Sequence, residues 1–313
     1  MASHKILVTG GAGYIGSILV PALLSQGHKV TVLDNMMYDQ TSLLECCHNP
    51  NFGVVNGDVR DERLLKDLVK DKDFIIPLAA LVGAPASNKD PHATVGINRD
   101  AVIMVNKLRS KNQHIIFPTT NSGYGIGQKD IFCTEETPLK PISLYGKTKV
   151  EAEQALLQSE NAITLRLATV FGFSPRMRLD LLVNDFTHKA YRERYIVLFE
   201  PHFKRNFLHI RDVASVFSFA IDNFDKMKNQ PYNVGLSSAN LSKMELCNKI
   251  KEQIPDFFIT VSEFNKDPDQ RNYIVSNEKV EKTGFRTAYT VEMGIKELIK
   301  GFSIINNNRF TNI

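Results

Sequence analysis

Short apolar runs alternate with longer amphipathic stretches through the first half of the chain. The apolar runs are rich in β-branched residues and are predicted to form six strands: Lys5–Thr9, Lys29–Leu33, Phe52–Asn56, Phe74–Pro77, Ile115–Pro118 and Ile163–Leu167. The longer stretches are predicted to form helices: Tyr14–Gln26, Asp61–Lys70, Pro91–Ser110 and Leu144–Ser159. Strands that alternate with helices form a parallel sheet covered on both faces. The pattern therefore predicts an α/β fold built on a doubly wound parallel sheet.

The regular alternation ends near Phe171. Three further helices are expected beyond it, among short strands and proline-containing loops: Leu179–Arg192, Asp212–Asn223 and Ser242–Ile254. We expect residues 1–171 to form the first domain. Residues 172–313 should form mainly a smaller domain, with some segments returning to the first. The tail Ser303–Ile313 is expected to fray.

Composition narrows the class of protein. The 313 residues, 43% hydrophobic and 23% charged, are typical of a globular protein with a sizeable core. No apolar run approaches the roughly 18 residues of a membrane span, and Ile6–Val8 lacks the features of a secretion signal. We expect a cytoplasmic protein without membrane contact. A net charge of +4, spread without a Lys/Arg block, favours a phosphorylated small molecule over nucleic acid.

The four cysteines are Cys46, Cys47, Cys133 and Cys247. Their spacing fits neither a metal site nor a disulfide scaffold, so we predict no metal and reduced thiols. A redox role of the adjacent pair Cys46-Cys47 is the alternative, but adjacency strains a disulfide.

A glycine-rich turn follows the first predicted strand, with the sequence TGGAGYIG from Thr9 to Gly16. Gly10 would allow the tight turn, Gly13 the approach of a pyrophosphate, and Gly16 close packing of helix and strand. The phosphates would lie at the helix N-terminus, which favours negative charge. A merely structural glycine turn is the alternative.

Asp34 ends the second predicted strand. A carboxylate there accepts hydrogen bonds from ribose hydroxyls and repels a 2′-phosphate, which favours NAD over NADP. A turn aspartate before Asn35 is the alternative.

Tyr145 and Lys149 are four residues apart and so share one face of a predicted helix. A tyrosine phenol is a poor base at neutral pH unless nearby positive charge stabilises the phenolate. Tyr145 could then remove a hydroxyl proton from a substrate. A solvated helix face is the usual meaning of such a pair.

In this order, the glycine turn, the acidic strand end, the Thr/Ser-rich segment Thr119–Tyr124 and the Tyr-Lys helix resemble the extended short-chain dehydrogenase/reductase family. Its members include nucleotide-sugar epimerases and dehydratases. The resemblance covers nearly the whole chain. It implies a Rossmann-type NAD-binding domain, a C-terminal substrate-binding domain, a nucleoside-diphosphate sugar as substrate, and a homo-oligomer.

The resemblance also implies roles for individual residues. Asp58 and Val59 match a segment that contacts adenine, and Asn98 matches an asparagine that helps to place the active-site strands. The implied cofactor-binding residues are Gly10, Gly13, Tyr14, Ile15, Gly16, Asp34, Asn35, Asp58, Val59, Leu78, Ala79, Ala80, Asn98, Tyr145 and Lys149. Pro77 departs from the family, in which a histidine is common at this place.

Thr120 matches the family's catalytic Ser/Thr, which makes Thr120, Tyr145 and Lys149 the implied catalytic residues. The next residues are Asn121 and Ser122, whereas the family's 4,6-dehydratases carry acidic residues there. Asn121 and Ser122 cannot supply the acid and base for loss of water. This argues for chemistry at one carbinol carbon, most plausibly carbon 4.

Arg205 and Arg271 resemble arginines that grip the substrate's diphosphate, a role that suits a guanidinium fork. Ser122, Arg176 and Arg178 are further candidates for substrate binding, although surface salt bridges explain Arg176 and Arg178 equally well. Thr169 stands where an asparagine often contacts the nucleotide sugar, which weakens any transfer of sugar specificity.

The segments NSGYGIGQKD (121–130) and SPRMRLDLLVNDFTHKAY (174–191) resemble a subgroup that handles GDP-linked heptoses or related bacterial surface sugars. The expected activity is therefore NAD-dependent oxidation at carbon 4, by a 4-dehydrogenase or a 4-epimerase. The alternative is a non-catalytic NAD-binding redox sensor or scaffold with the same fold.

Overall fold

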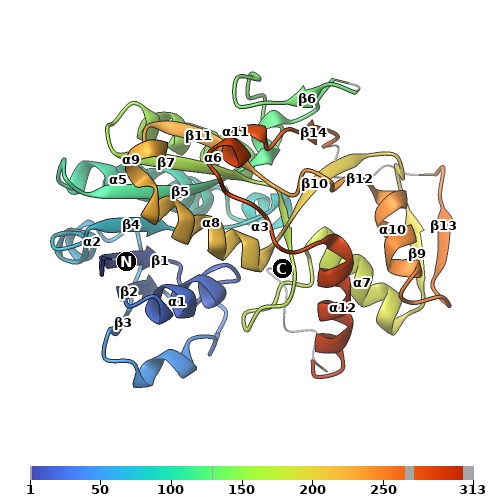
Figure 1. Cartoon of the computed structure of the whole chain (residues 1–313), viewed down its shortest axis with the longest axis horizontal. Coiled ribbons are helices and arrows are strands. Elements are labelled where there is room, and N and C mark those ends of the chain that lie inside the picture. The colour runs from blue at the N-terminus through green and yellow to red at the C-terminus, as the bar shows by residue number, and fades with distance from the viewer. Residues whose placement is uncertain (1, 129, 265–270, 306–313) are drawn as a thin grey trace.

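The computed structural model describes residues 2–128, 130–264 and 271–305. Its main feature is a seven-stranded sheet in the order β11-β7-β5-β4-β1-β2-β3, in which every neighbouring pair is parallel. Figure 1 shows these strands stacked beside a smaller group of helices and strands. The strands are β1 (Lys5–Thr9), β2 (Lys29–Asp34), β3 (Phe52–Asn56), β4 (Phe74–Pro77), β5 (His114–Thr120), β7 (Ala162–Leu167) and β11 (Gln230–Val234). The predicted α/β class is confirmed.

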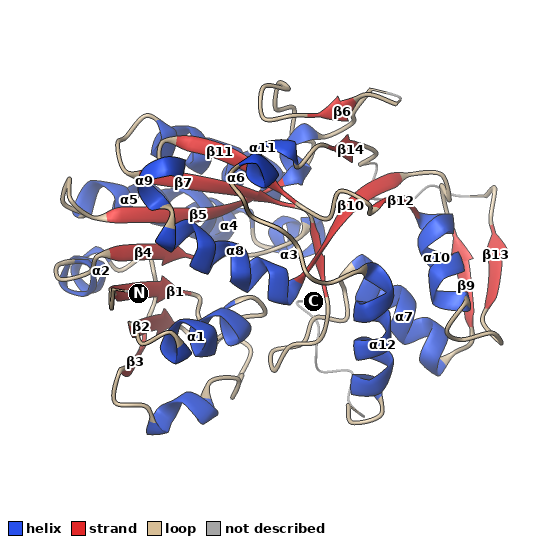
Figure 2. Ribbon diagram, in the orientation of Figure 1, coloured by secondary structure: helices blue, strands red, loops and turns tan. Residues whose placement is uncertain are grey.

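Helices cover both faces of the sheet (Figure 2). One face packs on α1 (Gly16–Ser25), α8 (Ile210–Asp222), α9 (Phe224–Met227) and α11 (Glu278–Lys282). The other packs on α2 (Glu62–Val69), α5 (Ala101–Leu108) and α6 (Leu144–Leu157). Central strands are buried from both sides, as shown by Leu7 and Ile116, which are 0% exposed. This burial explains why their sequences are almost continuously apolar.

The sequence located six of the seven strands to within two residues but missed β11. That strand contains Pro231, mixes polar with apolar residues and lies at the edge of the sheet. Proline argues against a central strand but is tolerated at an edge. The predicted helix Pro91–Ser110 is observed as α4 (Pro91–Val95), a π-helical turn (Gly96–Asp100) and α5.

The smaller group of elements, here called the C-terminal lobe, has its own apolar core. It contains β8 (Thr169–Phe171), α7 (Leu182–Arg192), β9 (Tyr195–Leu198), β10 (Lys204–His209), β12 (Asn240–Ser242), α10 (Lys243–Lys251), β13 (Phe258–Val261) and α12 (Val291–Phe302). The other short elements are 3-10 turns at Leu44–His48 and Asn121–Tyr124, α3 (Ala84–Lys89), β6 (Phe132–Cys133) and β14 (Ile274–Val275). Because α8 packs on the large sheet and β11 is its edge strand, the chain crosses between the two regions more than once. Most of the tail that we expected to fray, residues 306–313, lies outside the described residues.

Candidate active site

A cavity of about 860 Å³ opens where the parallel strands end at their carboxyl termini. Its wall is formed by the turns after β1, β2, β3, β4, β5 and β7, by the first turns of α6, and by side chains from the C-terminal lobe. The strand order reverses between β1 and β4, and ligands of open α/β sheets bind at such a reversal. The topology therefore places the cavity where a dinucleotide would bind.

The turn after β1 fits a pyrophosphate. Gly10 has a φ of +70°, and a Cβ atom there would lie 2.5 Å from the backbone nitrogen of Ala79. A Cβ at Gly16 would lie 2.2 Å from the carbonyl oxygen of Gly11. Gly10, Gly13, Tyr14, Ile15 and Gly16 all line the cavity, just where α1 begins. Bare backbone at a helix N-terminus is suited to phosphate.

Asp34 is 7% exposed and lies in the cavity wall beside Asn35. Its carboxylate accepts hydrogen bonds from the backbone nitrogens of Ala12 (3.0 Å) and Met36 (2.9 Å) and from Nε2 of Gln40 (3.2 Å). Burial raises the pKa of Asp34, and these hydrogen bonds oppose the rise. A carboxylate offers about four lone-pair sites, so the fixed side chain can still accept from a ribose hydroxyl.

The remaining predicted cofactor residues take two kinds of position. Lining residues are Asp58, Val59, Leu78, Ala79 and Ala80. Asn98 is 0% exposed and lies behind the lining. Its Oδ1 accepts from the Leu81 backbone nitrogen at 2.8 Å, and its Nδ2 donates to the Leu81 carbonyl at 2.9 Å. Asn98 thus orients the loop after β4, and no contact of its own with the cavity is seen.

The three predicted catalytic residues meet in this cavity. Thr120 ends β5, and its Oγ1 accepts from the backbone nitrogen of Ser122 at 3.1 Å. Tyr145 and Lys149 lie in α6, which begins at the cap residue Ser143. The Ser143 hydroxyl accepts from the Gly146 nitrogen at 3.1 Å and so fixes the helix start beside Tyr145.

Burial and charge act in opposite directions on this group. Burial raises the pKa of Tyr145, whereas the positive charges of Arg178 and Arg271 and a hydrogen bond with Thr120 oppose the rise. Lys149 is 3% exposed, with Nζ 3.8 Å from the centroid of the Phe117 ring. Burial lowers the pKa of Lys149 to about 7, and the charge of Glu153 opposes the fall. Lys149 can therefore change protonation state near neutral pH, whereas Tyr145 needs nearby positive charge to ionise.

A chain of polar contacts extends from Thr120 to the far side of the cavity. The Thr120 hydroxyl donates to Oγ of Ser122 at 3.0 Å, and Nη1 of Arg271 donates to the same oxygen. Ser122 therefore connects a substrate-side arginine with the catalytic hydroxyl. Asn121, by contrast, is buried at 1% exposure and does not line the cavity.

The other predicted arginines also line the cavity, and all are buried. Arg205 lies with its guanidinium carbon 5.5 Å from the centroid of the Tyr273 ring. Arg178 pairs with Asp180, with Nη2 2.5 Å from Oδ2. Arg176 lies 4.4 Å from the centroid of the Tyr38 ring, on the side of Asp34. Neither Arg176 nor Arg178 is the surface salt bridge that the sequence left open.

Sequence reasoning missed several lining residues, among them Tyr38, Asp180, Lys243 and Tyr273. Lys243 opens α10, is 3% exposed and donates from Nζ to the Phe199 carbonyl at 2.9 Å. A lysine after a helix cap is common on surfaces, so no local signal distinguishes it. Tyr38 and Tyr273 could have been found only from their neighbours in the fold.

From the sequence, neither a metal site nor a membrane span was expected. Within the described residues, no three His, Cys, Asp or Glu side chains gather as metal ligands would. No described helix is both long and apolar enough to cross a bilayer. The four cysteines are free thiols in the structure.

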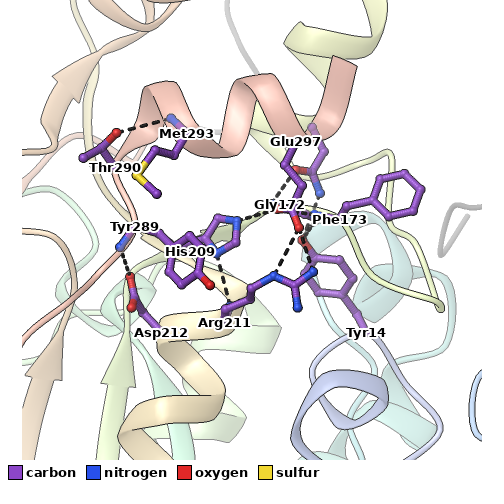
Figure 3. A network of polar contacts seen from close by, with 11 residues as sticks. Tyr14, Gly172, Phe173, His209, Arg211, Asp212, Tyr289, Thr290, Met293 and Glu297 are labelled. Atoms are coloured by element: carbon purple, nitrogen blue, oxygen red, sulfur yellow. Dashed lines mark hydrogen bonds and ion pairs between the residues drawn. The ribbon is translucent and has the colours of Figure 1, made fainter. Parts of the chain in front are cut away.

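A polar network ties the glycine turn to the last helix (Figure 3). The Tyr14 hydroxyl donates to the Gly172 carbonyl at 2.6 Å. Phe173, which follows Gly172, donates from its backbone nitrogen to the Glu297 carboxylate of α12 at 3.4 Å. The same carboxylate lies 2.7 Å from Nε2 of His209 and accepts from Nη2 of Arg211 at 2.8 Å. One side of the cofactor turn is therefore supported by the C-terminal lobe.

Comparisons with known proteins find relatives and a solved structure that match nearly the whole chain. The low-salt glycan biosynthesis protein Agl12 of Haloferax volcanii is 27% identical, over 94% of this chain and 97% of that protein. A putative UDP-glucose 4-epimerase of Methanocaldococcus jannaschii is 27% identical, over 97% of this chain and 99% of its own length. The crystal structure of UDP-glucuronic acid 4-epimerase from Bacillus cereus, in complex with UDP-glucuronic acid and NAD, matches with a TM-score of 0.84. It is 21% identical over 96% of this chain and 99% of that chain, so it supports the fold alone.

The sequence profile of the NAD dependent epimerase/dehydratase family matches residues 6–235, which is most of the chain. This span includes the glycine turn, Asp34, Thr120, Tyr145 and Lys149, and it confirms the resemblance drawn from those residues. The chain belongs to the NAD dependent epimerase/dehydratase family, so it is an enzyme of that type and NAD is its cofactor.

Proposed function

We propose that this enzyme oxidises carbon 4 of a nucleoside-diphosphate sugar, as a 4-dehydrogenase or a 4-epimerase. The observation that carries the proposal is the meeting of Thr120, Tyr145 and Lys149 in one cavity. The glycine turn lies in the same wall, and Arg205 and Arg271 approach from the C-terminal half of the chain. This is the arrangement needed to hold a cofactor and a diphosphate-linked sugar side by side.

The mechanism uses side chains of this cavity. Tyr145 takes the proton of the sugar hydroxyl, and Thr120 hydrogen-bonds the same oxygen. The Lys149 ammonium stabilises the phenolate of Tyr145. The Gly10–Gly16 turn and Asp34 would hold NAD, whose chemistry when bound would be to accept the hydride that leaves carbon 4. In an epimerase the keto sugar turns over in the cavity and is reduced on its other face, whereas in a dehydrogenase it leaves.

Loss of water from the sugar is not part of the proposal. It would need an acid and a base beside Thr120, where the chain has Asn121 and Ser122. Asn121 is buried outside the lining, and the Ser122 hydroxyl is bonded to Thr120 and Arg271. These positions support oxidation at a single carbon.

We propose a GDP-linked heptose, or a related bacterial surface sugar, as the substrate. The support is the sequence resemblance of segments 121–130 and 174–191 to the subgroup that handles such sugars. Both segments contribute lining residues to the cavity, including Ser122 from the first and Arg176, Arg178 and Asp185 from the second. The two segments thus lie where they could select the sugar.

The test is proton NMR of the products after incubation with catalytic NAD and a panel of GDP-, UDP- and dTDP-linked hexoses and heptoses. An epimer formed in catalytic amount means a 4-epimerase. A keto sugar limited to the amount of cofactor means a 4-dehydrogenase that needs a second oxidant. No change across the panel would contradict the proposal.

The variant Tyr145→Phe separates an enzyme from a non-catalytic NAD-binding protein. We expect turnover to fall by roughly 10²–10⁴-fold. NAD binding, measured by calorimetry, should persist. A biological output that survives this substitution would favour a sensor, although the presence of both Tyr145 and Lys149 supports catalysis.

We also propose that the enzyme acts in the cytoplasm as a homo-oligomer, as the family resemblance implies. Light scattering coupled to gel filtration measures the oligomeric state directly. A monomer at micromolar concentration would contradict this part of the proposal.

A further inference from the structure

Three ionisable residues follow one another along the buried side of α6. Tyr145, Lys149 and Glu153 are spaced by four residues, so they lie one helical turn apart. Lys149 is 3% exposed and Glu153 is 1% exposed. Glu153 does not line the cavity, and the proposed reaction gives it no role.

The Glu153 carboxylate is held by Arg166 of β7. Nη2 and Nε of Arg166 lie 2.6 Å and 2.9 Å from Oε1 of Glu153. Nη1 of Arg166 donates to the Tyr124 hydroxyl at 3.0 Å and to the Glu135 carbonyl at 3.1 Å. These bonds fix the buried pair between the helix and the sheet.

Stability alone is a weak reason for such a pair. The cost of removing both charges from water offsets much of their attraction, and apolar residues of similar volume often stabilise a protein as well or better. The more specific feature of this pair is its place, one turn beyond a buried lysine that the reaction uses. A carboxylate is the charge that would help an ammonium to persist there.

We propose that Glu153 is a positioning residue of this active site, whose Arg166-held carboxylate favours the charged form of Lys149 beside Tyr145. The inference rests on the proposed function for the role of Lys149. Burial lowers the pKa of Lys149 to about 7, and Glu153 is the charge that counters this effect. Because this pKa already includes the charge of Glu153, loss of Glu153 would lower the charged fraction of Lys149 further at neutral pH.

The other charged groups near α6 act on residues other than Lys149. Arg178 and Arg271 act on Tyr145 from the far side of the cavity. The Tyr124 hydroxyl faces Arg166, whereas the Glu135 carboxylate accepts from the Asn233 backbone nitrogen at 2.7 Å. On the exposed side of α6, Glu151 pairs with Arg99 at 3.0 Å, at 48% and 35% side-chain exposure. Glu151 therefore offers a matched control, a carboxylate of the same helix that points away from Lys149.

The experiment compares Glu153→Gln, the double variant Glu153→Gln/Arg166→Met, and the control Glu151→Gln in the full chain. The double variant removes the charge without leaving Arg166 buried and unpaired, so it carries the test if the single variant folds poorly. The pKa of Lys149 is measured by NMR of protein labelled with ¹³C at lysine Cε, with its signal assigned through Lys149→Met. This measurement needs no substrate.

We expect both Glu153 variants to lower the Lys149 pKa by about one pH unit or more, with no change in the control. At pH 7.5 the kcat of both should fall roughly tenfold, with the alkaline fall of the pH profile moved to lower pH and the KM for the sugar unchanged. A Lys149 pKa that stays at its wild-type value in both variants, or returns to it in the double variant, overturns the inference, since it would leave Glu153 a packing role only.

Failure of the proposed function gives a different result. In that case the wild-type enzyme converts no sugar in the panel, while the NMR titration still reports whether Glu153 sets the pKa of Lys149. The two ideas can therefore fail separately.

Discussion

At Gly10, backbone conformation and lack of space act together. Its φ of +70° is one that side chains disfavour, and the backbone of Ala79 would lie within 2.6 Å of any Cβ atom. Gly27 has a similar φ of +85°, but nothing lies within 4 Å of a Cβ there. Gly27 is therefore required for its backbone conformation alone, whereas Gly10 is required for both conformation and space.

Replacing each glycine by alanine measures this difference. Gly27→Ala should cost about 1–2 kcal/mol of unfolding free energy, from backbone strain alone. Gly10→Ala should cost more, about 3 kcal/mol or above, because the turn must also move away from Ala79. It should weaken NAD binding as well. Urea unfolding and calorimetry check both expectations, and equal losses in the two variants would contradict the argument.

Some site residues could be predicted because their roles depend on neighbours only a few positions away in the sequence. The glycine turn and the Tyr145-Lys149 spacing are set within a few residues, and both lie in the cavity wall. Lys243 and Tyr38 could not be found in this way, because they reach the cavity through the folding of distant segments. The orientation of Asn98 toward Leu81 is likewise a tertiary contact.

At the scale of elements, α12 is joined to the cofactor side of the molecule by Glu297 (Figure 3). Burial raises the pKa of Glu297, but the hydrogen bond with His209 and the contacts with Arg211 outweigh it, so the pKa is lowered overall. A lowered pKa means that the ionised carboxylate stabilises the folded state above the ordinary glutamate value. This contribution is lost as the pH falls through the folded-state pKa.

The variant Glu297→Gln tests this connection. At pH 7 we expect a loss of about 1–3 kcal/mol in unfolding free energy, because His209 and Arg211 lose a charged partner. The difference from wild type should shrink as the pH falls below about 4.3, the ordinary glutamate pKa. The control is Glu278→Gln, which removes one half of an exposed pair with Lys282 and should change little. A difference that is the same at pH 7 and pH 4 would count against the role given to charge.

Most strands of the large sheet could be predicted from their apolar sequences. The central strands are almost continuously apolar and were predicted closely, whereas β11 carries Pro231 and pairs with β7 alone. Edge position alone does not explain the miss, because β3 is also an edge strand and was predicted; in β11, Pro231 and Asn233 interrupt the apolar sequence. The π-helical turn at Gly96–Asp100 was also missed, because it lies within a continuous helical stretch between α4 and α5.

For the whole molecule, the sheet and the C-terminal half depend on each other. The outer edge of β7 is covered by β11, and Ile163 and Leu165 share a core with Val213 and Phe217 of α8. Cutting the chain after residue 171, where the first domain was expected to end, would separate these partners.

A fragment of residues 1–171 should therefore aggregate or unfold without cooperativity, since it exposes both an apolar face and an unpaired strand edge. Gel filtration and thermal unfolding by circular dichroism measure this. Co-expression with residues 172–313 should restore soluble material. A monomeric 1–171 fragment with a sharp thermal transition would instead establish an independent domain.

During translation, β11 is synthesised well after β7, the strand that it covers in the folded sheet. A ribosome completes β7 at Leu167 well before it reaches β11 at Gln230. At about 5–20 residues per second, the nascent sheet waits for several seconds with its edge open, and part of the C-terminal half must also leave the exit tunnel first. During that interval the unfinished sheet is a natural client for ribosome-associated chaperones, and slower translation would lengthen its exposure.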